Sequence, residues 1–159
     1  MKNTAKLSAC RQDRFALWRT WDESLPRVMF IGLNPSTADE NTDDPTLVRC
    51  MNFAKAWGYG GVCTANLFAY RATQPADMKK AADPVGARND YWLRKLARDA
   101  ALVVAAWGND GAFLERSAQV RAMLPGLQCL KVNGSGEPAH PLYQRADVTP
   151  IPYRPEAAA

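Results

Sequence analysis

Long apolar runs and signal-like segments are missing from this sequence. No stretch approaches the ~20 consecutive apolar residues that a membrane-spanning helix needs. The charged N-terminal residues 1–6 are followed by no apolar segment of the kind found in secretory signals. We therefore expect no membrane partner and a cytoplasmic location.

Paired cysteines are also missing, because Cys10, Cys50, Cys63 and Cys129 stand far apart. Zinc and iron–sulfur sites normally show local cysteine pairs, and disulfide frameworks belong mainly to smaller secreted chains. We expect the thiols to act as small buried apolar groups, and we expect no metal and no cofactor.

Strong charge of either sign is absent as well. Twenty Lys and Arg oppose 16 Asp and Glu, which gives a net charge of +4. This mild basic excess permits contact with a phosphate backbone but does not require it. The 159 residues, 47% of them hydrophobic, suit one domain with a real core. We expect a monomeric single domain over 1–159, with loose ends at about 1–10 and 150–159.

Four short apolar runs predict strands at 28–33, 61–67, 101–107 and 127–132. Helical spacing of apolar residues predicts helices at about 13–21, 44–57, 90–99 and 111–124. Asp44 followed by Pro45 is typical of a helix start. This alternation predicts an α/β fold with three layers, α/β/α, around a short four-stranded parallel sheet.

Polar or aromatic side chains follow every predicted strand, and ligands bind at the carboxyl ends of such sheets. Asn34, Asn66, Trp107 and His140, the only histidine, each stand just after or at the end of a strand. Singly they have ordinary interpretations: a turn, a backbone cap, a core residue and a solvated loop residue. Together they predict one preformed site.

These segments resemble the motifs of uracil-DNA glycosylases. Gly32-Leu33-Asn34-Pro35 is similar to their first motif in its mismatch-specific form, and Thr64-Ala65-Asn66-Leu67-Phe68 to the strand whose asparagine reads the base. Val104-Ala105-Ala106-Trp107-Gly108 and His140-Pro141-Leu142 resemble two later motifs, in the same order. The set also resembles an uncharacterised family of bacterial and phage proteins with N-P-S-T-A-D and H-P-L-Y segments.

The resemblance implies a fold of the uracil-DNA glycosylase type and a monofunctional N-glycosylase acting on a modified or deaminated base. His140 would donate to the departing base, Asn66 would read its edge, and Asn34 would hold the attacking water. Phe68 would stack on the base, and Leu142 or Tyr143 would wedge into the duplex. The rest of the implied substrate-binding set is Gly32, Pro35, Ser36, Trp107 and Gly108.

The sequence departs from the best-characterised glycosylases in its first motif, where Asn34 replaces a catalytic aspartate. Asn34 can orient water but cannot deprotonate it. Asp39, Asp43 and Asp44 are the nearby carboxylates; Asp44 is better explained as a helix cap and Asp43 as a turn residue. Asp39 is therefore our candidate base.

The expected partner is nucleic acid, preferably DNA, or a nucleotide. Arg71, Arg88 and Ser135 are our candidates for contact with the phosphate backbone. The loop around Ser135 lacks the Gly-Lys-Ser/Thr of a P-loop, which disfavours a nucleotide hydrolase of that class. Two alternatives stay open: a binding protein for nucleotides or modified nucleic acid that does not cleave, and a hydrolase of free nucleosides or nucleotides.

Overall fold

The four predicted strands form the centre of the sheet in a computed structural model, which describes residues 1–157. They are β3 (Arg27–Gly32), β4 (Gly61–Asn66), β5 (Leu102–Ala105) and β6 (Gln128–Cys129). They run parallel in the spatial order β4-β3-β5-β6. Their carboxyl ends therefore lie along one edge, as the sequence predicted.

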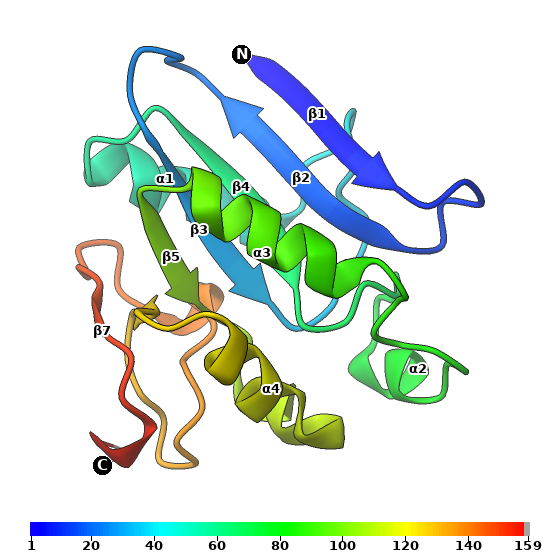
Figure 1. The fold of residues 1–159 in the computed structure, drawn as a ribbon. Coiled ribbons are helices and arrows are strands. Elements are labelled where there is room, and N and C mark those ends of the chain that lie inside the picture. The colour runs from blue at the N-terminus through cyan, green and yellow to red at the C-terminus, as the bar shows by residue number, and fades with distance from the viewer. Residues whose placement is uncertain (158–159) are drawn as a thin grey trace.

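The sheet is nevertheless larger than predicted, and it is mixed. It has seven strands, in the order β1-β2-β4-β3-β5-β6-β7 (Figure 1). The additional strands, all antiparallel to their neighbours, are β1 (Lys2–Leu7), β2 (Arg14–Thr20) and β7 (Ile151–Pro152). The prediction of a four-stranded parallel sheet is wrong on both counts. The ends that we expected to be loose carry β1 and β7, and residues 158 and 159 lie outside the described part.

The helix predicted at 13–21 is wrong, because this segment forms β2. Phe15, Trp18 and Trp21 are three residues apart, a spacing that fits a helix. Neighbouring residues nevertheless pack on opposite faces of the sheet, Ala16 in one core cluster and Leu17 in the other. Pairing with β2 covers the edge of β4, which would otherwise expose unpaired backbone groups.

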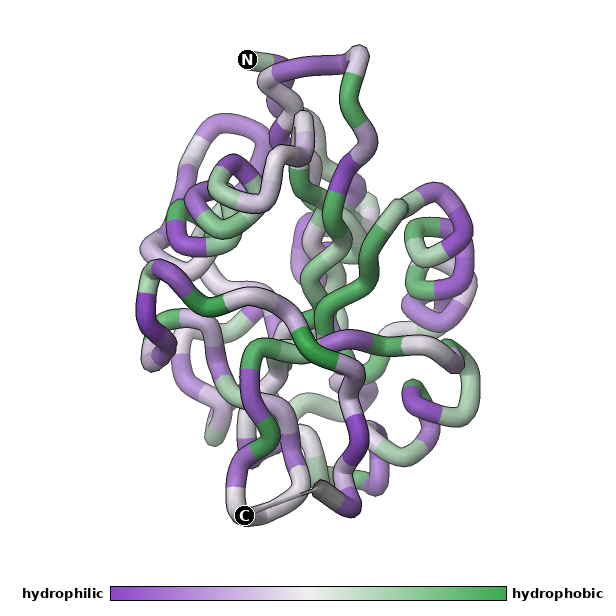
Figure 2. The backbone as a smooth tube through the Cα atoms, turned by 90° about the vertical axis from the view of Figure 1, so that its left-hand side faces the viewer, coloured by the Kyte–Doolittle hydropathy of each residue, from purple (hydrophilic) through white to green (hydrophobic). Residues whose placement is uncertain are grey.

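Helices cover both faces of the sheet, as Figure 2 shows. α1 (Pro45–Ala56) packs on one face over Val28, Phe30 and Val62. On the other face lie α2 (Pro75–Lys79), α3 (Asn89–Asp99) and α4 (Arg116–Met123). In residues 1–157 no helix has the length and apolarity needed to cross a membrane.

The helix predicted at 111–124 is shorter than expected. Its first part is a kinked 3-10 segment, η1 (Asn109–Glu115), and only Arg116–Met123 is α-helical. Leu114 and Glu115 adopt positive φ angles of 53° and 55°, which an α-helix cannot accommodate. Two further 3-10 turns are η2 (Pro141–Tyr143) and η3 (Pro155–Ala157).

α1 begins where the sequence predicted, and this start places its first turn at the carboxyl edge of the sheet. Asp44 caps it, because its Oδ1 accepts the Leu47 N–H at 2.8 Å and Pro45 occupies the first turn. After the last turn, Gly58 takes a φ of 87°, a conformation that favours glycine. The helix predicted at 90–99 is confirmed as α3.

Arg19 of β2 ties the loop between β3 and α1 to the sheet. Its side chain is fully buried, its Nε donates to the Asp43 carboxylate at 2.9 Å, and its Nη2 donates to the carbonyls of Asp39 and Thr42. Asp43 is thus an ion-pair partner. The loop has little regular structure of its own, so these bonds define its path.

Replacing Arg19 with methionine should lower the free energy of unfolding by about 3 kcal/mol, because its bonds to the Asp39 and Thr42 carbonyls and its ion pair with Asp43 are lost at ~1–3 kcal/mol each. Urea denaturation followed by circular dichroism measures this. The matched control, Arg98→Met on the exposed last turn of α3, should change stability by less than about 0.5 kcal/mol. Equal stability of the two variants would contradict the role given to Arg19.

Candidate functional site

One cavity of about 670 Å³ lies at the carboxyl edge of the parallel strands. Its lining comes from five segments: 32–38 after β3, 44–47 at the start of α1, 64–66 at the end of β4, 106–110 after β5, and 140–143. Arg14, Phe30, Cys50, Ala72, Thr73 and Pro75 complete it. Its volume falls within the usual range for small-molecule sites, ~300–1,000 Å³.

The cavity brings together most of the residues that the sequence singled out. Its lining includes Asn34, Asn66 and His140, together with Gly32, Pro35, Ser36, Trp107, Gly108, Leu142 and Tyr143. These residues gather at the carboxyl edge of the parallel strands, where the sequence placed them. Asp39, Phe68, Arg71, Arg88 and Ser135 do not line it.

Asn34 is held in one orientation by the backbone around it. Its amide Nδ2 donates to the carbonyl of Ala72 at 2.8 Å and to that of Pro35 at 3.2 Å. Both acceptors are carbonyl oxygens, so the NH₂ group must face them. Asn34 can therefore offer the cavity only an acceptor, Oδ1.

Asn66 is 5% exposed, and its Nδ2 has no hydrogen-bond partner in residues 1–157. Its Oδ1 lies over Gly32, where an added Cβ would come within 2.8 Å of it. Glycine at position 32 is therefore what leaves room for this amide. A buried amide donor without a partner is costly, and a ligand in the cavity could satisfy it.

Two buried side chains hold the backbone beside Asn66 and were missed by sequence reasoning. Asn89 donates its Nδ2 to the carbonyls of Asn66 and Leu67, at 2.9 and 3.1 Å. Arg116 donates its Nε to the Leu67 carbonyl at 2.8 Å. Together they bond the backbone carbonyls at the end of β4 and so fix the backbone of Asn66. The direction of the Asn66 side chain is therefore set by residues on the opposite face of the sheet.

His140 is half-buried at the start of η2, and its ring is oriented by a backbone contact. Its Nδ1 accepts the Leu142 N–H at 3.2 Å, which leaves the proton of the neutral ring on Nε2. Burial lowers the pKa of His140, an effect only partly opposed by the negative charge of Asp44. A neutral imidazole that can donate through Nε2 is the form expected at pH 7.

Of the three candidate carboxylates, Asp44 is the one that lines the cavity. Asp39 instead uses Oδ1 to accept the N–H groups of Asn41 and Thr42, at 2.8 and 2.9 Å, which stabilises its own turn. These bonds lower the pKa of Asp39, and nearby arginines contribute to the shift. The geometry therefore does not support Asp39 as the base, because its carboxylate is committed to the loop.

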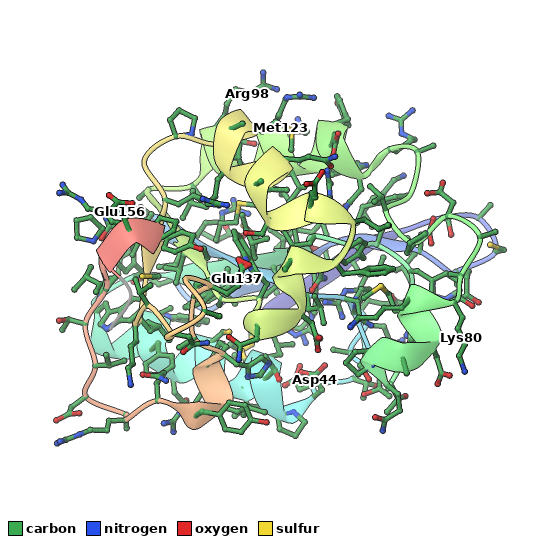
Figure 3. The ribbon with its side chains drawn as sticks, turned by 90° about the horizontal axis from the view of Figure 1, so that it is seen from below. Asp44, Lys80, Arg98, Met123, Glu137 and Glu156 are labelled. Atoms are coloured by element: carbon green, nitrogen blue, oxygen red, sulfur yellow. The ribbon has the colours of Figure 1, made fainter. Side chains whose placement is uncertain are left out.

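Trp107 is a core residue at the cavity floor, only 1% exposed. Its indole Nε1 donates to Glu137 Oε1 at 3.3 Å, and Ser117 donates to the same oxygen. Glu137, which lies near the middle of the view in Figure 3, is a buried residue that the sequence did not single out. Gly108 turns the chain away from β5 with a φ of 76°, close to His140.

Four residues predicted to touch nucleic acid have other contacts. Phe68 is fully buried and packs against Phe113 with ring centroids 5.6 Å apart, so it cannot stack on a base. Arg71 donates to the carbonyls of Ser36 and Arg11, which holds the loop. Arg88 lies over the Tyr91 ring, and Ser135 donates to Asn109 at 2.7 Å.

Leu142 and Tyr143 form an exposed rim beside the cavity, 42% and 82% exposed. The Tyr143 ring lies 5.5 Å from that of His140. Within residues 1–157 no group of three or more His, Cys, Asp or Glu residues is arranged to hold a metal ion. Cys50 lines the cavity, but burial raises the pKa of its thiol far above neutrality, so it stays protonated.

Titration of His140 by NMR should give a midpoint below its ordinary pKa of 6.5, because burial disfavours the imidazolium. In urea the midpoint should return to about 6.5. The unfolded chain then binds this proton more readily than the native protein, so stability should fall as the pH drops through 6.5. The single histidine gives one resonance to follow. A folded midpoint above 6.5 would contradict this description of the cavity.

No curated protein and no solved structure matches the chain. One family model does match, over residues 14–142, which include every residue that lines the cavity except Tyr143. The result agrees with the resemblance to an uncharacterised family. The chain belongs to the family described as "Protein of unknown function (DUF1643)".

Proposed function

We propose that this chain is a glycosidic-bond hydrolase, a monofunctional N-glycosylase that acts on a modified or deaminated base held in the cavity. The observation that carries the proposal is the meeting of Asn34, Asn66 and His140 in one cavity. Each side chain presents there the kind of group that one part of the reaction needs. The resemblance to uracil-DNA glycosylases supports the same assignment.

Asn66 would read the edge of the base, because an amide has both a donor and an acceptor. Its Nδ2 has no partner among residues 1–157, so a carbonyl oxygen of the base could supply the missing acceptor. Thr64 lines the same wall and also has a buried hydroxyl oxygen without a partner. A base that offers polar groups on one edge would satisfy both, whereas an apolar ligand would leave them unpaired.

His140 would stabilise the departing base. As the bond between the sugar C1′ and the base nitrogen breaks, negative charge grows on the base, and a donor near a carbonyl oxygen lowers the barrier. The Nε2–H of a neutral imidazole supplies such a donor without bringing a full charge into the buried site. The fixed Nδ1 contact with Leu142 keeps this donor available.

Water would complete the reaction by adding its oxygen to C1′, with its proton passing ultimately to the departing base. Asn34 Oδ1 can hold this water as an acceptor, because the amide nitrogen is occupied by two carbonyls. Asp44 is the carboxylate best placed to assist, since Asp39 does not line the cavity and Asp110 is paired with Lys79. Asp44 Oδ1 caps α1, which leaves Oδ2 for this role.

The proposal predicts base release from duplex oligonucleotides that carry uracil or 5-hydroxymethyluracil, detected as alkali-induced strand breaks. His140→Ala and Asn66→Ala should each reduce release by about 10²–10³-fold. Asn52→Ala, an exposed asparagine on α1, is the control and should keep full activity.

Release that is unchanged in the His140 and Asn66 variants would refute the proposal. Tight, salt-dependent binding of oligonucleotides without strand breaks would instead favour a non-cleaving binding protein. Release of base from free nucleosides or nucleotides, but not from oligonucleotides, would favour the remaining alternative.

Gly32→Ala tests base reading separately from folding. The added Cβ would meet the Asn66 side chain at 2.8 Å, and that side chain can move at low cost. The free energy of unfolding should change by no more than about 1 kcal/mol. Base release should nevertheless fall at least about 10-fold, because Asn66 no longer lies where the base needs it. Full activity in this variant would show that the position of Asn66 is unimportant.

A further inference from the structure

Arg14 differs from the other two buried arginines of the described chain. Arg19 and Arg116 are 0% and 2% exposed, and each has a carboxylate partner: Asp43 at 2.9 Å and Asp90 at 2.5 Å. Arg14 is 5% exposed, and in residues 1–157 no carboxylate oxygen lies within 4.0 Å of its guanidinium nitrogens. It is also the one of the three that lines the cavity.

The hydrogen bonds of Arg14 leave most of its guanidinium unused. Nη1 donates to the Ala38 carbonyl at 2.9 Å, and Nε is buried without a partner in the described chain. A guanidinium has five N–H donors, so the group is far from satisfied. Burial lowers its pKa to about 10, an effect that the negative charges of Asp44 and Asp39 only partly oppose. A buried charge without an ion-pair partner is costly, and departures of this kind are expected at functional sites.

The other charges around the cavity are already compensated. Asp110 pairs with Lys79 at 2.9 Å. Asp44 caps α1 through its Oδ1, so its negative charge faces the positive end of that helix. His140 is neutral at pH 7, as described above. Asp44 and Asp39 act on Arg14 from a longer distance, but no carboxylate of residues 1–157 is in ion-pair contact with it.

Topology explains how this arginine reaches the site. β2 runs antiparallel to β4, with Leu17 opposite Thr64, so the beginning of β2 lies beside the end of β4. The Arg14 N–H bonds the Ala69 carbonyl just beyond that end. Arg14 thus stands at the same edge as Asn66, and the buried unpartnered atoms Arg14 Nε, Thr64 Oγ1 and Asn66 Nδ2 all belong to residues that line one cavity.

We infer that Arg14 binds an anionic phosphate group of the substrate, so that the cavity takes a base together with a phosphate and not a base or nucleoside alone. The inference rests on the proposed function for the base end of the cavity. A guanidinium matches phosphate oxygens with paired N–H donors, and such charge-assisted bonds are stronger than neutral ones. The phosphate can belong to a free nucleotide or to a nucleic-acid strand.

Inorganic phosphate is the first probe. Thermal unfolding of the full chain should shift upward with phosphate at constant ionic strength. The shift should vanish in Arg14→Gln and remain in Arg98→Gln, an exposed arginine that Figure 3 shows on the side of the molecule away from Asp44. No shift in the wild type, or equal shifts in both variants, would overturn the inference.

Calorimetry with nucleotides separates the two sources of phosphate. The affinities of deoxynucleoside 5′-monophosphates, among them deoxyuridine 5′-monophosphate, are each compared with those of the matching nucleoside and of a short uracil-containing oligonucleotide. The best phosphate-bearing probe should bind about 10- to 100-fold tighter than its nucleoside. If the monophosphates bind more tightly than the nucleosides, a free nucleotide is the source of the phosphate. If only the oligonucleotide binds more tightly, the source is the nucleic-acid strand. If neither the monophosphates nor the oligonucleotide binds more tightly than the nucleosides, the inference is overturned.

Arg14→Lys keeps the positive charge and should retain part of the gain in affinity that a phosphate gives over the nucleoside. Arg14→Gln should lose this gain. If Arg14→Gln does not fold, the wild-type comparison of phosphate-bearing probes with nucleosides decides by itself. Arg14-dependent phosphate binding without base release would refute the glycosylase and keep this inference. Base release with the same KM in wild type and Arg14→Gln would refute the inference and keep the glycosylase.

Discussion

Guanidinium groups bonded to backbone carbonyls hold the loop between β3 and α1, and the candidate site depends on this loop. Arg14 bonds Ala38, Arg19 bonds Asp39 and Thr42, and Arg71 bonds Ser36. An irregular loop has few internal backbone bonds, so its carbonyls need outside donors if they are to be buried. Arginine reaches such carbonyls from the neighbouring strand with several donors at once. The loop in turn carries Asn34 and leads into the first turn of α1.

The polar groups around the cavity fall into two classes: those bonded to the backbone and those with buried donors that lack a partner in the described part of the chain. The side-chain nitrogens of Asn34, Asn89 and Arg116 donate to backbone carbonyls and therefore fix positions. Arg14 and Asn66 retain buried donors without partners in residues 1–157. Three buried atoms without partners among the described residues, Arg14 Nε, Thr64 Oγ1 and Asn66 Nδ2, belong to residues that line this one cavity, and this is the ground for proposing that it takes a ligand.

The central architecture followed from local pattern. Apolar runs located the four parallel strands, and Asp44-Pro45 located the start of α1, because caps and apolar spacing act over a few residues. The edge strands were harder to see. A segment such as 14–20 carries buried residues on both faces and a helix-like spacing of aromatics, and its pairing with β4 lies about 45 residues further along the chain.

The sequence by itself determined that the polar residues after the parallel strands gather at one edge, because the carboxyl ends of parallel strands lie along the same edge of a sheet. It thereby placed Asn34, Asn66 and His140 together. Tertiary structure decided which other residues line the cavity. Phe68 faces the core, Asp39 closes its own turn, and Arg14 enters the cavity from an antiparallel strand. The physical reason is that the direction and partners of a side chain depend on contacts between segments far apart in the chain, which local pattern does not encode.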